Sequence, residues 1–211
     1  YNDSLGIEKL QKYASLFGLN ERTGIEIEEA APQIANEFPV MAAIGQSNNN
    51  YTTVQLARYV TAVANEGTVY QYTLLNRLED SDGNVLQTFE PQVRNQIDVL
   101  DTEEWNAIHS GMRMVVENTK EFDGFPIEAA GKTGTAQQNL KRPNHALFVG
   151  YAPYDDPEIS IATRIAYGYT SHNAAKLARN VFAYYFNVEN EDELLNGQAA
   201  NGNSSSNEIS D

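Results

Sequence analysis

The sequence predicts an α+β fold in which helices flank an antiparallel sheet. Three stretches rich in β-branched and apolar residues follow one another closely, at about 127–138, 145–152 and 158–168. The two links between them contain proline, asparagine and aspartate, which are typical of turns. A segment with helical periodicity follows at about 173–186. Strands this close in sequence are expected to pair in antiparallel fashion, with the last helix laid on the sheet.

Two helices are predicted in the first part of the chain. Residues 6–17 form the first, and Gly18 is placed to end it. Residues 52–66 give the clearest helical pattern, with Thr52 or Thr53 as the N-cap and Gly67 after the last turn. Apolar residues at helical spacing define the buried faces, namely Leu10, Tyr13, Ala14 and Phe17 in the first helix and Val54, Leu56, Val60 and Val63 in the second.

The segments beside these helices look less regular. Residues 19–38 are expected to be a loop with a short extended piece at 24–27. The acidic cluster in this loop, Glu26, Glu28 and Glu29, is expected to be solvated. Residues 69–78 and 85–89 are rich in β-branched and large apolar side chains, and an Asp-Gly turn signal lies between them. This pattern predicts a β-hairpin.

A helix is also predicted at 102–118, with Thr102 as its cap and Trp105 on its buried face. After residue 186 the composition changes, because the remaining segment holds six acidic residues and no basic one. Residues 196–211 carry too little apolar surface to offset the entropy of ordering and are expected to be disordered. The sequence is therefore divided into one domain at 1–186 and an acidic, Ser/Asn-rich tail at 187–211.

The composition excludes several classes of function. The 211 residues include 14 Lys and Arg against 29 Asp and Glu, and the net charge is −15. This balance disfavours binding to nucleic acid, which depends on cationic contacts to phosphate. The absence of cysteine excludes a thiol nucleophile and a thiolate zinc site. His109, His145 and His172 are scattered without the spacing of metal ligands, so no metal or organic cofactor is implied.

The segment with the clearest chemical meaning is Lys132-Thr133-Gly134-Thr135, at the start of the three predicted strands. Lys132 can support proton transfer or attract a carboxylate, and the two threonine hydroxyls can donate to that carboxylate. Gly134 lets a substrate backbone approach, and the Thr135 N–H can stabilise an oxyanion. A chance tetrapeptide is the simplest alternative. A nucleotide-binding P-loop would need glycine where Pro126 stands, five positions before Gly131.

The run resembles the third active-site motif of penicillin-binding proteins and serine β-lactamases. Other segments resemble penicillin-binding proteins in the same order, and they cover residues 1–186. Residues 44–46 with 51–57 resemble a Gly-Gln…Thr-Pro-x-Gln-Leu-Ala stretch, with Thr53 in place of proline. Residues 145–153 resemble the strand after the third motif, and residues 5–7, 17–19 and 23–25 resemble the segment after the second. The likeness is greatest to class B penicillin-binding proteins, the monofunctional D,D-transpeptidases.

Two motifs of that family are missing. The chain has no Ser-x-x-Lys nucleophile motif, and the expected place of Ser-x-Asn lies upstream of Tyr1. Ser47-Asn48-Asn49 has the Ser-x-Asn spelling but follows the Gly-Gln pair, so it is interpreted as a loop. The chain is therefore identified as the C-terminal part of a transpeptidase domain, with a penicillin-binding protein/serine β-lactamase-like fold that is incomplete.

The resemblance implies a function outside the cytoplasmic membrane, with the membrane anchor beyond this chain. It implies cross-linking of peptidoglycan stem peptides by serine acyl transfer, with β-lactams reacting at the same serine. Lys132 and Thr135 would be catalytic, and Thr133, Gly134 and Thr135 would bind substrate. The implied partner is the upstream part of the same protein, which would supply both missing motifs. A β-lactam sensor and a non-catalytic scaffold stay open as alternatives, and a β-lactamase fits the flanking segments less well.

Overall fold

The structure, a computed structural model, describes residues 3–190 and residue 194. Its main sheet consists of β5 (Ala130–Ala136), β6 (His145–Ala152) and β7 (Ile159–Ile165). Both strand pairs are antiparallel, in the order β5-β6-β7. The predicted α+β class and the three consecutive strands are thus confirmed. Within the described residues, β5 pairs on one side only, so its other edge is open.

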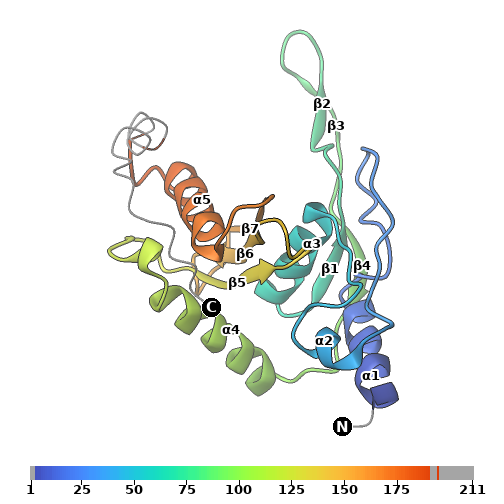
Figure 1. The fold of residues 1–211 in the computed structure, drawn as a ribbon. Coiled ribbons are helices and arrows are strands. Elements are labelled where there is room, and N and C mark those ends of the chain that lie inside the picture. Colours follow the sequence, from blue (N-terminus) through green and yellow to red (C-terminus); the bar gives the residue numbers. More distant parts are fainter. Residues whose placement is uncertain (1–2, 191–193, 195–211) are drawn as a thin grey trace.

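Helices cover both faces of this sheet (Figure 1). On one face, α5 (Ser171–Tyr185) packs its buried Phe182 against Phe148 of β6. On the other face, α3 (Thr53–Ala64) packs Val60 against Tyr151. All four side chains are fully buried. Phe148 and Tyr151 lie on opposite faces of β6, because strand residues alternate between the two faces. Both helices were predicted from their apolar stripes, and Thr52 caps α3 as expected.

Three further helices surround this core. The first, α1 (Asp3–Leu16), begins three residues earlier than predicted, and α2 (Pro39–Ala43) was not predicted. The helix α4 (Thr102–Glu117) matches its prediction except at the cap. Asp101, not Thr102, is the N-cap, since its carboxylate accepts from the Glu104 N–H and Glu104 accepts from the Asp101 N–H. A short 3-10 helix, η1 (Lys120–Phe122), follows α4.

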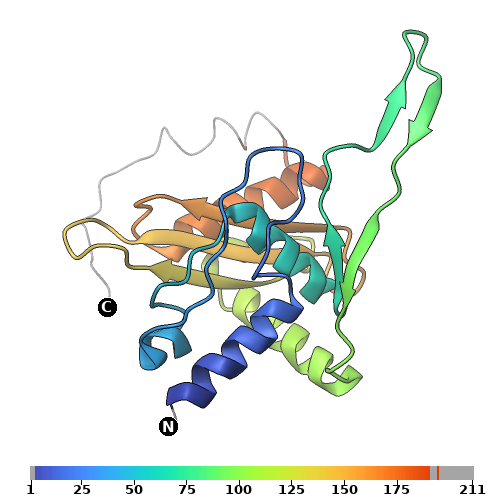
Figure 2. The same ribbon diagram turned by 90° about the vertical axis from the view of Figure 1, so that its right-hand side faces the viewer.

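The predicted hairpin is present, but it is built from four short strands instead of two. The inner pair is β1 (Thr68–Gln71) with β4 (Gln92–Gln96), and the outer pair is β2 (Arg77–Glu79) with β3 (Val85–Thr88). The expected continuous strand at 69–78 was wrong, because 72–76 bend away between the two pairs. The outer pair projects from the body of the molecule (Figure 2).

The loop at 19–38 is confirmed as irregular, and 24–27 form no strand. The expectation that its acidic cluster is solvated was wrong for Glu29, which is buried. Its carboxylate accepts hydrogen bonds from the Thr23 N–H at 2.7 Å, from the Thr23 hydroxyl at 2.9 Å and from the Thr52 hydroxyl at 2.9 Å. Glu29 therefore joins the loop to the start of α3.

Of the predicted tail, only 187–190 and Leu194 belong to the described residues, so the expected disorder at 196–211 lies outside them. Glu189 in this stretch forms an ion pair with Arg179 of α5. No helix among the residues that the structure describes is long and apolar enough to cross a membrane.

Candidate active site

Lys132, Thr133, Gly134 and Thr135 lie on β5, beside its open edge. The register places Lys132 opposite Val149, Gly134 opposite Leu147 and Thr135 opposite Ala146. Lys132 and Thr135 are exposed, while Thr133 and Gly134 are half-buried. The strand is thus held by β6 on one side and accessible on the other.

Two side-chain contacts show which backbone groups of β5 face the open edge. Lys132 Nζ donates to the Thr133 carbonyl at 2.9 Å, and Gln46 Nε2 approaches the Thr135 carbonyl at 3.5 Å. In an antiparallel strand the N–H and C=O of one residue point to the same side. The N–H groups of Thr133 and Thr135 therefore face the open edge together with their carbonyls.

The polar side chains of the motif are largely uncommitted. Within the described part of the chain, Lys132 makes no ion pair with a carboxylate, although the chain carries 29 acidic residues. Neither the Thr133 nor the Thr135 hydroxyl has a hydrogen-bond partner among the residues that the structure describes. An ammonium without a carboxylate partner and two hydroxyls without hydrogen-bond partners, next to a strand edge, can together bind an anionic group of an extended ligand.

The two glycines of this strand have different surroundings. A Cβ atom at Gly131 would lie 2.3 Å from the Phe148 ring and 2.7 Å from the Val149 carbonyl oxygen. A Cβ atom at Gly134 would meet only the Leu147 Cβ, at an ordinary 3.5 Å. Packing therefore requires glycine at position 131 but not at 134, where the missing side chain leaves free space beside the motif.

The loop at 44–50 brings the Gly-Gln pair next to the motif strand. Gln46 lies at the β5 edge through its approach to Thr135. Ser47, Asn48 and Asn49 instead bond back to the preceding chain. Ser47 Oγ donates to the Glu37 carbonyl at 2.5 Å, and Asn49 Oδ1 accepts from the Ala35 N–H at 2.8 Å. This geometry agrees with the interpretation of Ser47-Asn48-Asn49 as a loop.

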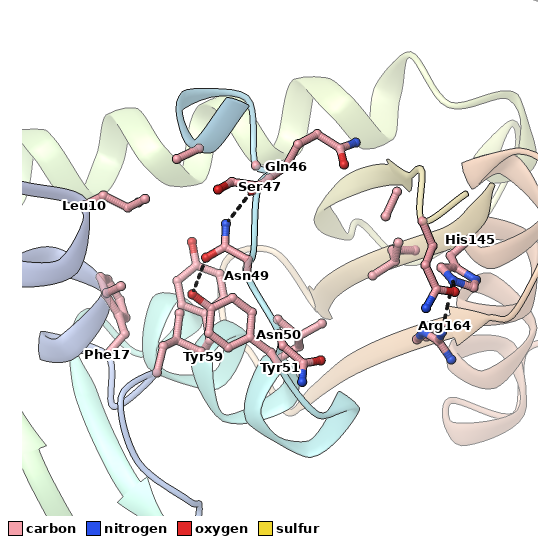
Figure 3. Close-up of a pocket in the computed structure, with 18 of the residues that line it drawn as sticks. Leu10, Phe17, Gln46, Ser47, Asn49, Asn50, Tyr51, Tyr59, His145 and Arg164 are labelled. Atoms are coloured by element: carbon pink, nitrogen blue, oxygen red, sulfur yellow. Dashed lines mark hydrogen bonds between the residues drawn. The ribbon is translucent and has the colours of Figure 1, made fainter. Parts of the chain in front are cut away.

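A cavity of about 730 Å³ lies between α1, the loop at 44–50, the start of α3 and the C-terminal end of β5 (Figure 3). Leu10, Phe17 and Tyr59 line one side, and His145 and Arg164 line the other. Tyr51 also lines it and donates its hydroxyl proton to Asn49 at 2.9 Å. Burial raises the pKa of Tyr51 to about 12, so its hydroxyl is a neutral donor near pH 7.

His145 is buried at the cavity wall and is fixed by its hydrogen bonds. Nδ1 accepts from the Tyr167 N–H at 3.1 Å, so Nε2 carries the proton of the neutral ring and donates to Gln138 Oε1 at 2.9 Å. The sequence placed His145 beside the motif strand, and the structure confirms this position opposite Ala136. The ring joins the segment after β5 to the segment after β7, and both of its nitrogens make hydrogen bonds.

The other histidines lie away from the motif. His109 bonds to the Val63 carbonyl at 2.7 Å and packs between helices, and His172 pairs with Glu121. Among residues 3–190 and 194, no group of three or more His, Cys, Asp or Glu side chains could hold a metal ion.

The sequence did not indicate Gln138 or Arg164 as cavity residues. Gln138 follows β5 and Arg164 belongs to β7. The pairing of the strands brings both side chains next to His145. Arg164 lies opposite Leu147 in the strand pair, so both side chains are on the face of the sheet that lines the cavity. Correct strand boundaries would have predicted this position of Arg164.

Comparisons with known proteins agree with this arrangement. The family model described as "Penicillin binding protein transpeptidase domain" matches residues 1–183. The chain is 32% identical over 220 residues to a peptidoglycan D,D-transpeptidase MrdA of Haemophilus influenzae, covering 87% of this chain and 33% of that protein. It is 26% identical to penicillin-binding protein 2A of Bacillus subtilis, covering 94% of this chain and 31% of the relative. The chain thus spans about a third of the length of these relatives.

Solved structures are similar in fold. Penicillin-binding protein 2B of Streptococcus pneumoniae strain R6 matches with a TM-score of 0.75 and 25% identity, covering 87% of this chain and 33% of the other. Penicillin-binding protein A of M. tuberculosis, in an imipenem acyl-enzyme complex, matches with a TM-score of 0.74 and 22% identity. That match covers 85% of this chain and 42% of the other.

Proposed function

This chain belongs to the penicillin-binding protein transpeptidase family, among class B members, and on that premise we propose that it carries the Lys-Thr-Gly half of a peptidoglycan D,D-transpeptidase site. The reaction is acyl transfer through a serine. The serine hydroxyl attacks the D-Ala-D-Ala carbonyl and D-Ala leaves with a proton on its nitrogen. An amine of a neighbouring stem peptide then attacks the acyl-enzyme, which forms the cross-link and regenerates the serine.

The residues of β5 take separate roles in this proposal. Lys132 supports proton transfer and attracts the substrate carboxylate, and the hydroxyls of Thr133 and Thr135 donate to that carboxylate. The Thr135 N–H stabilises the oxyanion, a role for which one donor typically contributes about 10²–10³ in rate. Gly134 leaves room for the substrate backbone. Lys132 and Thr135 are thus the catalytic residues of this chain.

The open edge of β5 carries this proposal. The N–H and C=O groups of Thr133 and Thr135 face that edge, as two contacts to their carbonyls show. An extended peptide can add to such an edge with main-chain hydrogen bonds, while side chains of the strand contact the ends of the peptide. The Lys132 ammonium supports the same interpretation, because no carboxylate of the described residues pairs with it and a ligand can bring the negative charge.

The nucleophile is proposed to come from the upstream part of the same protein, together with Ser-x-Asn and the membrane anchor. The cavity beside the motif supports this, because apolar side chains such as Phe17 and Leu147 line an open space there. A segment that filled it would cover apolar surface and lie next to β5. The site would then act at the extracytoplasmic face of a bacterial membrane on stem peptides and β-lactams.

The test is turnover by the whole protein. A donor peptide ending in D-Ala-D-Ala and an amine acceptor should give one D-Ala for each cross-linked product. Acylation by penicillin without any cross-linked product would instead show a β-lactam sensor. A whole protein that neither reacts with penicillin nor releases D-Ala would be a scaffold, and the proposal would fail.

A further inference from the structure

The cavity beside β5 has two sides of different character. Apolar side chains such as Leu10 and Phe17 line one side, and His145 and Arg164 line the other, with Gln138 bonded to His145 (Figure 3). Of the described residues that line the cavity, none is Asp or Glu, and Arg164 is the single Lys or Arg. The cavity wall thus carries one cation and no carboxylate, in a chain with a net charge of −15.

Arg164 leaves its guanidinium available to a ligand. The side chain is exposed, and among the described residues it forms no ion pair with Asp or Glu. It contacts His145 Nε2 at 3.4 Å, but that nitrogen already donates its proton to Gln138. A guanidinium offers five N–H donors in a planar fork that matches the geometry of a carboxylate. Arg164 can therefore bind a carboxylate that enters the cavity.

The strand register connects Arg164 to the motif strand. Gly134 of β5 lies opposite Leu147 of β6, and Leu147 lies opposite Arg164 of β7. Residues directly opposite each other share one face of the sheet, and a Cβ atom at Gly134 would indeed meet the Leu147 Cβ, at 3.5 Å. Ala136, two residues after Gly134, lies on the same face and lines the cavity. The floor of the cavity therefore runs from the motif strand across Leu147 to Arg164.

The proposed binding mode determines where each residue of a donor peptide lies. Its terminal carboxylate is bound by Lys132, Thr133 and Thr135. A peptide that adds antiparallel to β5 then runs from these residues toward Ala136 and Gln137, which line the cavity. Two residues of a strand span about 7 Å, so the third residue from the carboxyl end of the peptide lies beside the cavity.

The distance across the sheet sets the length of the ligand side chain. Three strand spacings of about 4.8 Å separate the added peptide from β7, which is about 14 Å in all. An extended arginine side chain reaches about 7 Å from its Cα atom, since it contains six bonds of about 1.5 Å that zigzag. A short acidic side chain such as that of aspartate falls short of Arg164. A side chain with four methylene groups before its carboxylate covers the remaining distance.

We propose that Arg164 determines specificity by binding a carboxylate at the end of a long side chain, on the third residue from the carboxyl end of the donor peptide. This inference rests on the proposed function and names the donor class, a peptide that ends in D-Ala-D-Ala and carries a second carboxylate on the residue before them. Arg164 binds the donor but takes no part in the transfer of the acyl group. The apolar side of the cavity stays available to the upstream segment.

The test compares two donors that differ only in this charge, namely acetyl-L-2-aminopimelyl-D-Ala-D-Ala and the same peptide with its side chain as the amide. D-Ala release by the whole protein, with one amine acceptor at a fixed concentration, gives kcat/KM for each donor. We expect wild type to prefer the acid about tenfold or more, which is typical of one charge-assisted hydrogen-bonded pair. Arg164→Gln should abolish this preference by lowering kcat/KM for the acid, and kcat/KM for the amide should stay within about twofold of wild type.

Arg142→Gln is the matched control. It removes the same charge from the loop between β5 and β6, where Arg142 does not line the cavity and donates to the Tyr167 hydroxyl at 2.7 Å. This variant should prefer the acid as strongly as wild type does. Arg164→Lys keeps the charge but loses the planar fork, so its preference should lie between those of wild type and Arg164→Gln.

The outcomes separate this inference from the proposed function. Equal kcat/KM for the two donors in wild type, or an unchanged preference in Arg164→Gln, overturns the inference, while release of D-Ala still supports the proposed function. Equal loss of preference in Arg142→Gln and Arg164→Gln would show long-range attraction by the net charge and overturns the inference too. Release of D-Ala from neither donor overturns both.

Discussion

Gly131 and Gly134 stand three residues apart on one strand and have different reasons to be glycine. The space at Gly131 is taken by Phe148 and the Val149 carbonyl, whereas the space at Gly134 is free. A sequence alone shows two glycines in one motif and cannot separate packing from ligand access. The structure separates them and so supplies a matched pair of variants.

Gly131→Ala should lower the free energy of unfolding by about 2 kcal/mol, because the added methyl overpacks the core. Gly134→Ala should change it by no more than about 0.5 kcal/mol, since its Cβ meets only an ordinary contact. In the whole protein, however, Gly134→Ala should slow acylation by penicillin about tenfold by intruding on the bound ligand. Denaturant unfolding and acylation kinetics measure the two effects. Equal loss of stability in both variants would contradict this account of Gly134.

Lys132→Ala should leave stability nearly unchanged, because the side chain is exposed and donates only to the adjacent Thr133 carbonyl. Acylation of the whole protein by penicillin should fall by about 100-fold or more, which is typical for loss of a group that assists proton transfer. Lys141→Ala, in the neighbouring turn, is the control and should react at the wild-type rate. A Lys132→Ala protein that reacts as fast as the control would remove Lys132 from the site.

At the scale of elements, helical and strand periodicity predicted α1, α3, α4, α5 and the main sheet correctly. The elements it missed have no such periodicity. The strand β4, Gln-Val-Arg-Asn-Gln, contains one apolar residue, and it forms because β1 lies beside it. The buried polar residues Glu29 and Arg58 were also missed, because their partners lie elsewhere along the chain.

Arg58 joins α3 to the segment after α1. Its guanidinium is buried and donates to the carbonyls of Gly18, Glu21 and Arg22. Arg58→Ala should lower the free energy of unfolding by about 3 kcal/mol, because it leaves the buried Gly18 carbonyl and two partly buried carbonyls without a donor. Thermal unfolding measures this loss. A loss below about 0.5 kcal/mol, the size of an ordinary surface substitution, would show that water satisfies these carbonyls equally well.

The ion pair between Glu21 and Arg94 joins the same segment to β4 and gives a pH-dependent prediction. The hydrogen bonds from Arg94, at 3.0 and 2.9 Å, hold the pKa of Glu21 below its ordinary value of 4.5. A lowered pKa stabilises the fold above the unfolded-state pKa, and this contribution disappears as the pH falls through the folded-state pKa.

Arg94→Ala should therefore be less stable than wild type at pH 7, with a smaller loss than Arg58→Ala since the pair is exposed. The difference between Arg94→Ala and wild type should shrink as the pH falls below 4.5. Chemical denaturation at a series of pH values measures it. A difference that stays constant with pH would mean that the Glu21 carboxylate does not contribute through its charge.

At the scale of the whole molecule, the sequence predicted the fold and the place of the motif more fully than the surroundings of the motif. The order of the family-like segments along the chain was sufficient for both. The cavity could not be predicted, since it is lined by α1, the loop at 44–50, α3 and the three strands of the main sheet, which meet only in the folded chain. The same is true of the exposed hairpin, whose residues have an ordinary strand pattern but no core beneath them.

The central claim is the proposed division of the active site between this chain and an upstream part of the same protein. The decisive measurement is the location of the adduct after reaction with a fluorescent penicillin. This chain is tested alone and then mixed with the upstream segment, and mass spectrometry identifies the labelled serine. We expect label on an upstream serine, only when both parts are present, and loss of that label with Lys132→Ala. Label on a serine within these 211 residues would contradict it.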